Sequence, residues 1–267
     1  MNPFEKDWTK TDPTSQAASG AYADITVVFD RSASMQGLAG AVVEGFNQFA
    51  TDLRKNVGNN VWTLVQFDDP SSAAGAGEPF PQVLFEQQSE RTLPLLTQQA
   101  APPTFISSGS ITAPQPVGSG YVAFAPRGGT ALVDALCATI DRTEQRTSGQ
   151  AHVKVVMGIW TDGEENASRQ YTSDALRERI ARTQTKLGWD YLYFGANQDA
   201  FHQAGNAGIG GYVSSGHLAP GTSYTNNFAA TAQGMQEAIY SGVIGLYSIA
   251  SGSVASGRIM PHHVVTH

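Results

Sequence analysis

Apolar runs of strand length alternate with amphipathic segments of helical length along most of this chain. Continuous short apolar runs indicate strands, and apolar positions three and four apart indicate helices. Strands are predicted at 24–30, 61–67, 82–86, 153–160 and 189–194, and helices at 40–54, 130–143, 173–185 and 226–240. This order predicts a Rossmann-like, doubly wound, mostly parallel α/β sheet with helices on both faces. We expect the short run at 82–86 to form one antiparallel edge strand.

Three segments depart from this alternation. Residues 1–22 form a polar arm, and residues 251–267 form a mixed tail in which metal binding by its three histidines is a minor alternative. The segment 94–125 is rich in Pro, Ser and Gly, so it cannot be a regular helix. We therefore expect one domain over 23–250, with an insertion at 94–125. The glycines of 205–216 lack the setting of a dinucleotide site and predict a loop with a short last strand.

Composition limits the partners and the compartment. The chain has 267 residues, a net charge of -7 and a pI near 5.3, which argues against nucleic-acid binding. The single cysteine, Cys137, excludes an internal disulfide and is expected to be a buried core thiol. No stretch approaches about 18 apolar residues, which argues against a membrane span. The N-terminus lacks a secretory signal, so we expect a cytoplasmic or virion protein that is not Sec-exported.

Five hydroxyl and carboxylate side chains follow the ends of predicted strands or precede a predicted helix: Asp30, Ser32, Ser34, Thr130 and Asp162. Open α/β sheets gather their ligands at such strand ends. Oxygen donors with few carboxylates suit Mg²⁺, with Mn²⁺ or Ca²⁺ as alternatives, and the absence of His and Cys argues against zinc or copper. An ion with two carboxylates around it stays electrophilic. It could accept an acidic oxygen from a partner protein.

Each of these motifs also has a structural explanation. Asp30 with Ser32 or Ser34 could cap the helix that follows, and Thr130 could cap the next one. The Asp162-Gly163 pair could be an ordinary turn. The coincidence of all three motifs at one sheet edge favours the metal site.

The motifs read Asp30-Arg31-Ser32-Ala33-Ser34, Gly128-Gly129-Thr130-Ala131-Leu132 and Thr161-Asp162-Gly163. With these, the chain resembles a von Willebrand factor type A domain that carries a metal-ion-dependent adhesion site, over most of 24–250. The resemblance implies that the two serines and Thr130 coordinate the ion directly or alternately with Asp162. It also implies that Asp30 acts mainly through water. Within the family, the chain is most similar to bacterial and bacteriophage members.

Two expectations concern the surroundings of the site. Asp68 and Asp69 are predicted to form a solvated turn before Pro70, although they could add negative potential beside the metal. Asp30 and Asp162 are both expected at a solvent-facing sheet edge. Replacing either one should then weaken metal binding and leave the fold intact.

The leading hypothesis for function is a metal-dependent protein-binding module whose partner presents Asp or Glu. The alternative is a structural or decoration protein of a phage particle, in which the same fold makes subunit contacts as a homo-oligomer or particle assembly. A third hypothesis is a metal-dependent phosphate-ester hydrolase, for which no lysine or second acid stands in a recognisable register. The sequence also contains no nucleophile elbow and no phosphate-binding loop. We therefore expect that the protein is not an enzyme.

Overall fold

A six-stranded sheet forms the centre of the computed structural model, which describes residues 22–55, 60–98, 121–150, 153–162, 165–195, 209 and 212–214. The strands are β1 Tyr22–Asp30, β2 Val61–Phe67, β3 Gln82–Ser89, β6 Val153–Thr161, β7 Asp190–Gly195 and β8 Tyr212–Ser214. Their spatial order is β3-β2-β1-β6-β7-β8, and only β3 is antiparallel to its neighbour. The predicted fold class and its antiparallel edge strand are confirmed.

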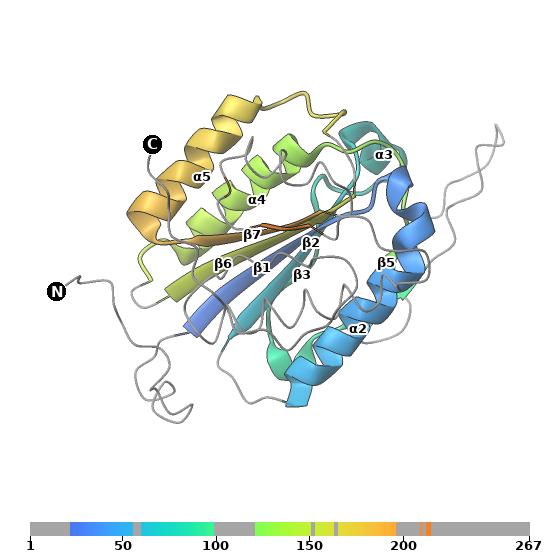
Figure 1. Cartoon of the computed structure of the whole chain (residues 1–267), viewed down its shortest axis with the longest axis horizontal. Coiled ribbons are helices and arrows are strands. Elements are labelled where there is room, and N and C mark those ends of the chain that lie inside the picture. The colour runs from blue at the N-terminus through green and yellow to red at the C-terminus, as the bar shows by residue number, and fades with distance from the viewer. Residues whose placement is uncertain are drawn as a thin grey trace.

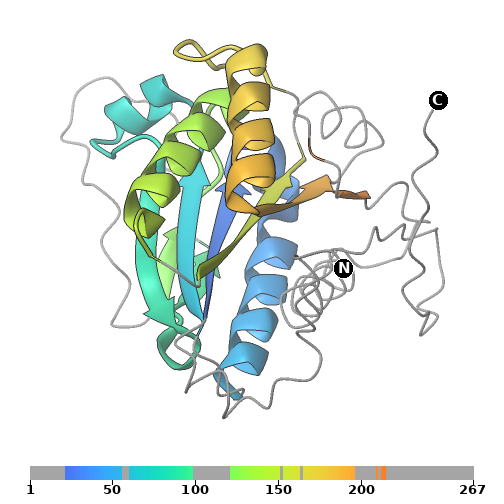
Figure 2. The ribbon, with the colours of Figure 1, turned by 90° about the vertical axis from the view of Figure 1, so that its left-hand side faces the viewer.

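Helices cover both faces of this sheet (Figures 1 and 2). The helix α2, Ala39–Lys55, lies on one face, while α4, Leu132–Thr147, and α5, Ser173–Leu187, lie on the other. Successive residues of β1 point to opposite faces, so Ile25, Val27 and Phe29 pack with α2 while Val28 packs with α4. Burial on both faces explains why the parallel strands read as continuous apolar runs.

A second, two-stranded sheet occupies the ends of the predicted insertion. Its strands, β4 Leu95–Gln98 and β5 Tyr121–Phe124, pair in parallel. The side-chain amide of Asn47 in α2 donates to the Leu96 carbonyl at 2.8 Å and accepts from the Leu96 N–H at 2.7 Å. The segment is not helical, as predicted, but the sequence missed these strands because each is four residues long. Residues 99–120 lie outside the described part of the chain.

The structure differs from the predictions in the cap of α5 and in three short helices. The helix α5 starts at Ser173, but its cap is Thr172, whose hydroxyl accepts a hydrogen bond from the Ala175 N–H at 3.2 Å. The sequence favoured Ser173 or Asp174 for that role. The short helices η2 Ala33–Leu38, α3 Pro70–Gly75 and η3 Glu90–Thr92 were not predicted.

The prediction for the single cysteine is confirmed: Cys137 is buried and free. Other sequence predictions fall outside the described residues. The predicted helix at 226–240, the arm, the tail and all six histidines lie outside the described residues. Within the described ranges, no helix is both long enough and apolar enough to cross a membrane.

Candidate metal centre

The ends of β1 and β6 bring the first and third motifs together. Asp30 is the last residue of β1, and Asp162 follows Thr161, the last residue of β6. The two strands are parallel neighbours, with Phe29 opposite Trp160. The strand order reverses at β1, because β2 lies on one side of it and β6 on the other. In open α/β sheets, ligands bind outside the carboxyl ends of the strands at such a reversal.

A chain of hydrogen bonds joins four of the five predicted ligands. The Ser32 N–H donates to Oδ1 of Asp30 at 2.7 Å. The hydroxyl oxygens of Ser32 and Ser34 lie 2.9 Å apart, and the Ser34 hydroxyl donates to Oδ1 of Asp162 at 2.8 Å. Oδ2 of Asp30 accepts from the Thr161 hydroxyl at 2.6 Å. The two motifs therefore meet at one point, and the role of these residues as metal ligands stays a prediction.

Burial differs sharply across this chain of side chains. Asp30 is fully buried and Ser32 is 1% exposed, whereas Ser34 is exposed and Asp162 is half-buried. The expectation that both aspartates face solvent is therefore wrong for Asp30, whose carboxylate accepts from the Ser32 N–H and from the Thr161 hydroxyl of the neighbouring strand β6. The open side of the site lies at Ser34 and Asp162.

The electrostatics of the two carboxyl groups follow from this burial. Burial raises the pKa of Asp30 to about 6, against the opposing hydrogen bonds from Thr161 and Ser32. Burial also raises the pKa of Asp162, and the hydrogen bond from Ser34 opposes it. A buried carboxylate whose charge is poorly solvated gains from a nearby cation. Both groups are therefore arranged so that a bound cation would stabilise their ionised forms.

Backbone contacts bring Thr130 to the same edge. The Ala33 N–H donates to the Gly128 carbonyl at 3.0 Å, and the Arg127 N–H donates to the Arg31 carbonyl at 2.7 Å. The loop that carries Thr130 therefore runs beside the loop that carries Ser32. Thr130 itself is 2% exposed.

Residues after Asp162 hold Thr130 from the other side. The Asn166 side chain accepts a hydrogen bond from the Thr130 N–H at 2.9 Å. The Thr130 carbonyl in turn accepts from the N–H groups of Asn166 and Ala167, at 3.0 and 3.1 Å. The second and third motifs are thus joined through Asn166, which the sequence analysis did not single out.

The same loop supplies the cap of α4. Glu165 accepts from the Val133 N–H at 2.8 Å, and the Ser168 hydroxyl accepts from the Asp134 N–H at 3.0 Å. These side chains satisfy first-turn donors that have no partner inside the helix. Ala131 occupies the cap position without a side-chain hydrogen bond, so the alternative in which Thr130 caps α4 is wrong. Ser32 likewise precedes η2 without a side-chain cap bond.

The Asp134 side chain of α4 binds the same loop from the helix side. Its carboxylate, 2% exposed, accepts hydrogen bonds from the N–H groups of Arg169, Gln170 and Tyr171 at distances between 2.7 and 3.1 Å. Three donors of one loop therefore depend on a single carboxylate. The sequence indicated no role at the start of α4 for Asp134 or Glu165, because the contacts that join them to the other segment span more than thirty residues of the chain.

Replacing Asp134 with alanine is expected to lower the free energy of unfolding by about 3 kcal/mol, since it removes a buried carboxylate that accepts from three backbone N–H groups. Urea unfolding in EDTA measures the loss. Asp141→Ala is the matched control on the same helix, because Asp141 is largely exposed and pairs with Arg179. That control should cost less than about 1 kcal/mol. Equal losses of unfolding free energy in the two variants would contradict a stabilising role for the contacts between Asp134 and the loop.

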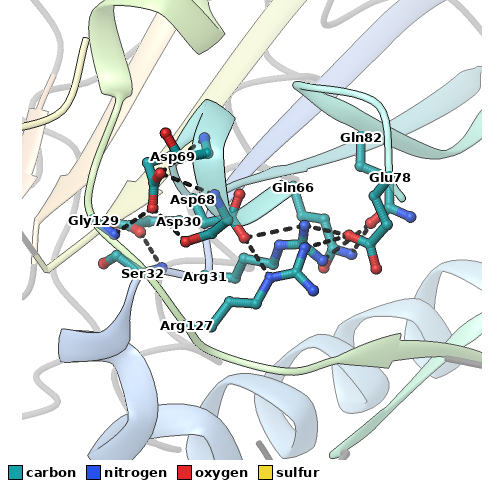
Figure 3. A network of polar contacts seen from close by, with 12 residues as sticks. Asp30, Arg31, Ser32, Gln66, Asp68, Asp69, Glu78, Gln82, Arg127 and Gly129 are labelled. Carbon is teal, nitrogen blue, oxygen red and sulfur yellow. Dashed lines mark hydrogen bonds and ion pairs between the residues drawn. The ribbon is translucent and has the colours of Figure 1, made fainter. Parts of the chain in front are cut away.

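Asp68 and Asp69 do not form the predicted solvated turn. Asp68 is fully buried against the side chains of Arg31 and Arg127. Asp69 caps α3 through the N–H groups of Ser71 and Ser72, and its Oδ2 accepts from the Gly129 N–H at 2.8 Å (Figure 3). The turn prediction failed because the Gly129 N–H and the guanidinium groups of Arg31 and Arg127, which these aspartates bind, come from distant parts of the chain.

The contact with Asp69 also explains the first glycine of the second motif. Gly128 has a φ of +67°, which side chains rarely tolerate. A Cβ atom there would lie 2.3 Å from both Oδ2 of Asp69 and Oγ of Ser72. Glycine therefore allows the loop before Thr130 to approach α3 closely.

The donor set can be tested against the requirements of Mg²⁺. Adjacent ligands of an octahedral Mg²⁺ at about 2.1 Å lie about 3 Å from one another. The Ser32 and Ser34 oxygens already stand 2.9 Å apart, so an ion could replace their mutual hydrogen bond with little movement. Over the described ranges, no cluster of three or more His, Cys, Asp or Glu side chains offers another kind of metal site. The donors present fit a hard cation bound through hydroxyl and carboxylate oxygens.

Comparison with known proteins supports the fold. No protein-family model and no curated protein matches the sequence. Among solved structures, the chain is similar to the pilus adhesin SpaC from Lactobacillus rhamnosus GG, with 17% identity and a TM-score of 0.50, over 82% of this chain and 30% of the adhesin. It is also similar to proximal thread matrix protein 1 from the mussel byssus, with 16% identity and a TM-score of 0.45, over 80% of this chain and 46% of that protein. The chain spans less than half the length of either protein, and the likeness to the adhesin is one of fold.

Proposed function

We propose that this chain is a binding module that uses a divalent cation to hold an acidic side chain of a protein partner. The ligands would be Asp30, Ser32, Ser34, Thr130 and Asp162, and the ion of first choice is Mg²⁺. The observation that carries the proposal is the hydrogen-bonded chain from Asp30 through the two serines to Asp162 at the point where the strand order reverses.

Each residue has a distinct role in this proposal. Ser32 and Ser34 present two hydroxyl oxygens to the cation, while Asp162 balances its charge on the open side of the site. Asp30, buried behind them, orients Ser32 through its N–H and would orient metal-bound water. When bound, the ion supplies an electrophilic position for a carboxylate. Because only two protein carboxylates surround it, the ion keeps enough positive charge to attract an acidic side chain of a partner.

Several observations favour a protein partner over other classes. The net charge of -7 disfavours the phosphate backbone of nucleic acids. The fold shared with a pilus adhesin is compatible with protein binding. Coordination accounts for all five residues without a nucleophile or general base, so we propose binding and not catalysis.

A peptide-display selection on the immobilised protein in Mg²⁺ tests this function. Retained peptides are expected to share an Asp or Glu, to be released by EDTA, and to lose binding when that residue becomes Asn or Gln. Asp162→Ala bait should retain none of them. Asp174→Ala is the control, because Asp174 is an acidic residue on α5 that is 85% exposed and belongs to none of the motifs. Peptides held equally well in EDTA would contradict the proposal, and self-assembly that persists in EDTA would favour the particle component.

A further inference from the structure

A buried network of ion pairs lies beside the candidate metal centre (Figure 3). Nη2 of Arg31 lies 2.5 Å from Oε2 of Glu78 and 3.3 Å from Oδ2 of Asp68. Arg127 reaches the same two oxygens, with Nε 2.7 Å from Asp68 and Nη2 2.6 Å from Glu78. Two carboxylates are therefore shared by two guanidinium groups.

The two arginines lie within or directly before the motifs that carry the predicted metal ligands. Arg31 lies between Asp30 and Ser32, and Arg127 directly precedes Gly128-Gly129-Thr130. Their backbones are also joined, because the Arg127 N–H donates to the Arg31 carbonyl at 2.7 Å. Each arginine thus belongs to a loop that carries predicted metal ligands.

The two carboxylates come from a third part of the chain. Asp68 follows β2, and Glu78 lies between α3 and β3. The Asp68 carbonyl also accepts a hydrogen bond from the Ala131 N–H at 2.9 Å. The connection from β2 to β3 therefore holds both ligand loops at once, through side chains and backbone.

We infer that Asp68 and Glu78 are positioning residues of the metal centre. Through Arg31 and Arg127 they fix the distance between the loop of Ser32 and Ser34 and the loop of Thr130. This inference rests on the proposed function, since it assigns the network a role in metal affinity. Arg127 bridges the two carboxylates with two nitrogens of one planar guanidinium group, which restricts orientation as well as distance and suits this role better than a flexible lysine would.

The other end of the sheet provides a matched comparison. Arg146 pairs with Asp24 at 2.8 Å and with Glu86 at 2.9 Å, near the start of β1. Arg146 is 9% exposed and Asp24 is fully buried, much as Arg127 is 13% exposed and Asp68 fully buried. Both networks join a largely buried arginine to a fully buried aspartate, although Glu86 is 31% exposed and Glu78 only 7%. Only the network of Arg127 touches the loops with the predicted ligands. A purely structural role would make them equivalent.

The test compares Arg127→Met with Arg146→Met. Arg31 still pairs with both Asp68 and Glu78 after the first change, so no buried charge is left alone and the variant is expected to fold. Arg127→Met should weaken Mg²⁺ binding, measured by calorimetry, by about tenfold, the lower end of the range for outer-shell residues. Arg146→Met should leave the affinity unchanged, whatever its effect on thermal stability. Arg127→Lys should restore part of the affinity.

Amide hydrogen exchange in EDTA gives a second readout that needs no metal. Arg127→Met should speed exchange at the backbone N–H groups of Ala33, Ala131 and residue 127, which bridge the loops. Arg146→Met should leave exchange at these groups unchanged. If the wild type binds no Mg²⁺, the proposed function fails, and exchange still shows whether the network positions the loops. Unchanged exchange in Arg127→Met, or an equal loss of affinity in both variants, would overturn the inference.

Discussion

Asp162→Ala is expected to lower the affinity for Mg²⁺ by at least about 100-fold, beyond the usual effect of an outer-shell change. Asp162 carries one of the two carboxylates of the site and lies on its open side, where it accepts from the Ser34 hydroxyl. Titration calorimetry with Mg²⁺, repeated with Mn²⁺, measures the loss.

The stability of this variant without metal separates a ligand from a structural residue. Burial raises the pKa of Asp162, so its charge is unfavourable in the empty site. In EDTA, the melting temperature of Asp162→Ala should therefore equal or exceed that of the wild type. Asp174→Ala should leave the affinity unchanged, because Asp174 lies on α5 outside the motifs. A variant that unfolds in EDTA would identify Asp162 as a structural residue.

Asp30→Asn is expected to have opposite effects on stability with and without metal. Burial raises the pKa of Asp30 to about 6, above its value in the unfolded chain, so the folded protein binds this proton more tightly. Its favourable contribution is fully present below the unfolded value and is lost as the pH rises through about 6. In EDTA, the wild type should thus lose up to about 3 kcal/mol relative to Asp30→Asn between about pH 4 and pH 8.

Mg²⁺ at about 1,000 times its dissociation constant should reverse that order at about pH 8, because it stabilises the folded wild type by about 4.1 kcal/mol, which exceeds the loss of about 3 kcal/mol. Chemical unfolding of both proteins, at both pH values, with Mg²⁺ and with EDTA, measures all four differences. The comparison with Asp30→Asn removes the contributions of other groups, such as Asp69 and Glu86, whose pKa values are lowered. Parallel pH profiles for the two proteins in EDTA would show that Asp30 does not titrate as described.

The parallel strands were predictable because their signal is local. Continuous apolar runs at β1, β2 and β6 reflect burial on both faces, which any window along the chain reveals. The two strands β4 and β5 were missed because each is short and pairs with a partner across the intervening residues 99–120. Their pairing depends on packing against α2 and not on a pattern of their own.

In the candidate site, too, features with a local sequence signal were predictable and features that depend on tertiary contacts were not. The positions of Asp30 and Asp162 at neighbouring strand ends followed from the strand pattern and the rule for parallel sheets. The burial of Asp30 and its raised pKa did not, because both depend on how the chain packs around the end of β1. The roles of Asp69 and Asn166 in holding the loop of Thr130 were also hidden, since each contacts a loop distant in sequence.

The sequence by itself determined where the candidate ligands stand relative to the strands. Asp30 and Asp162 come at the ends of two apolar runs, and hydroxyl groups lie next to them in the chain. Local patterns suffice for this, because strand burial and motif spacing act over a few residues. Only the tertiary structure decided how the ligand loops are held, through Asp68, Glu78 and Asp134. Charged groups that are stable in a protein interior need partners, and here the fold supplies those partners from distant segments.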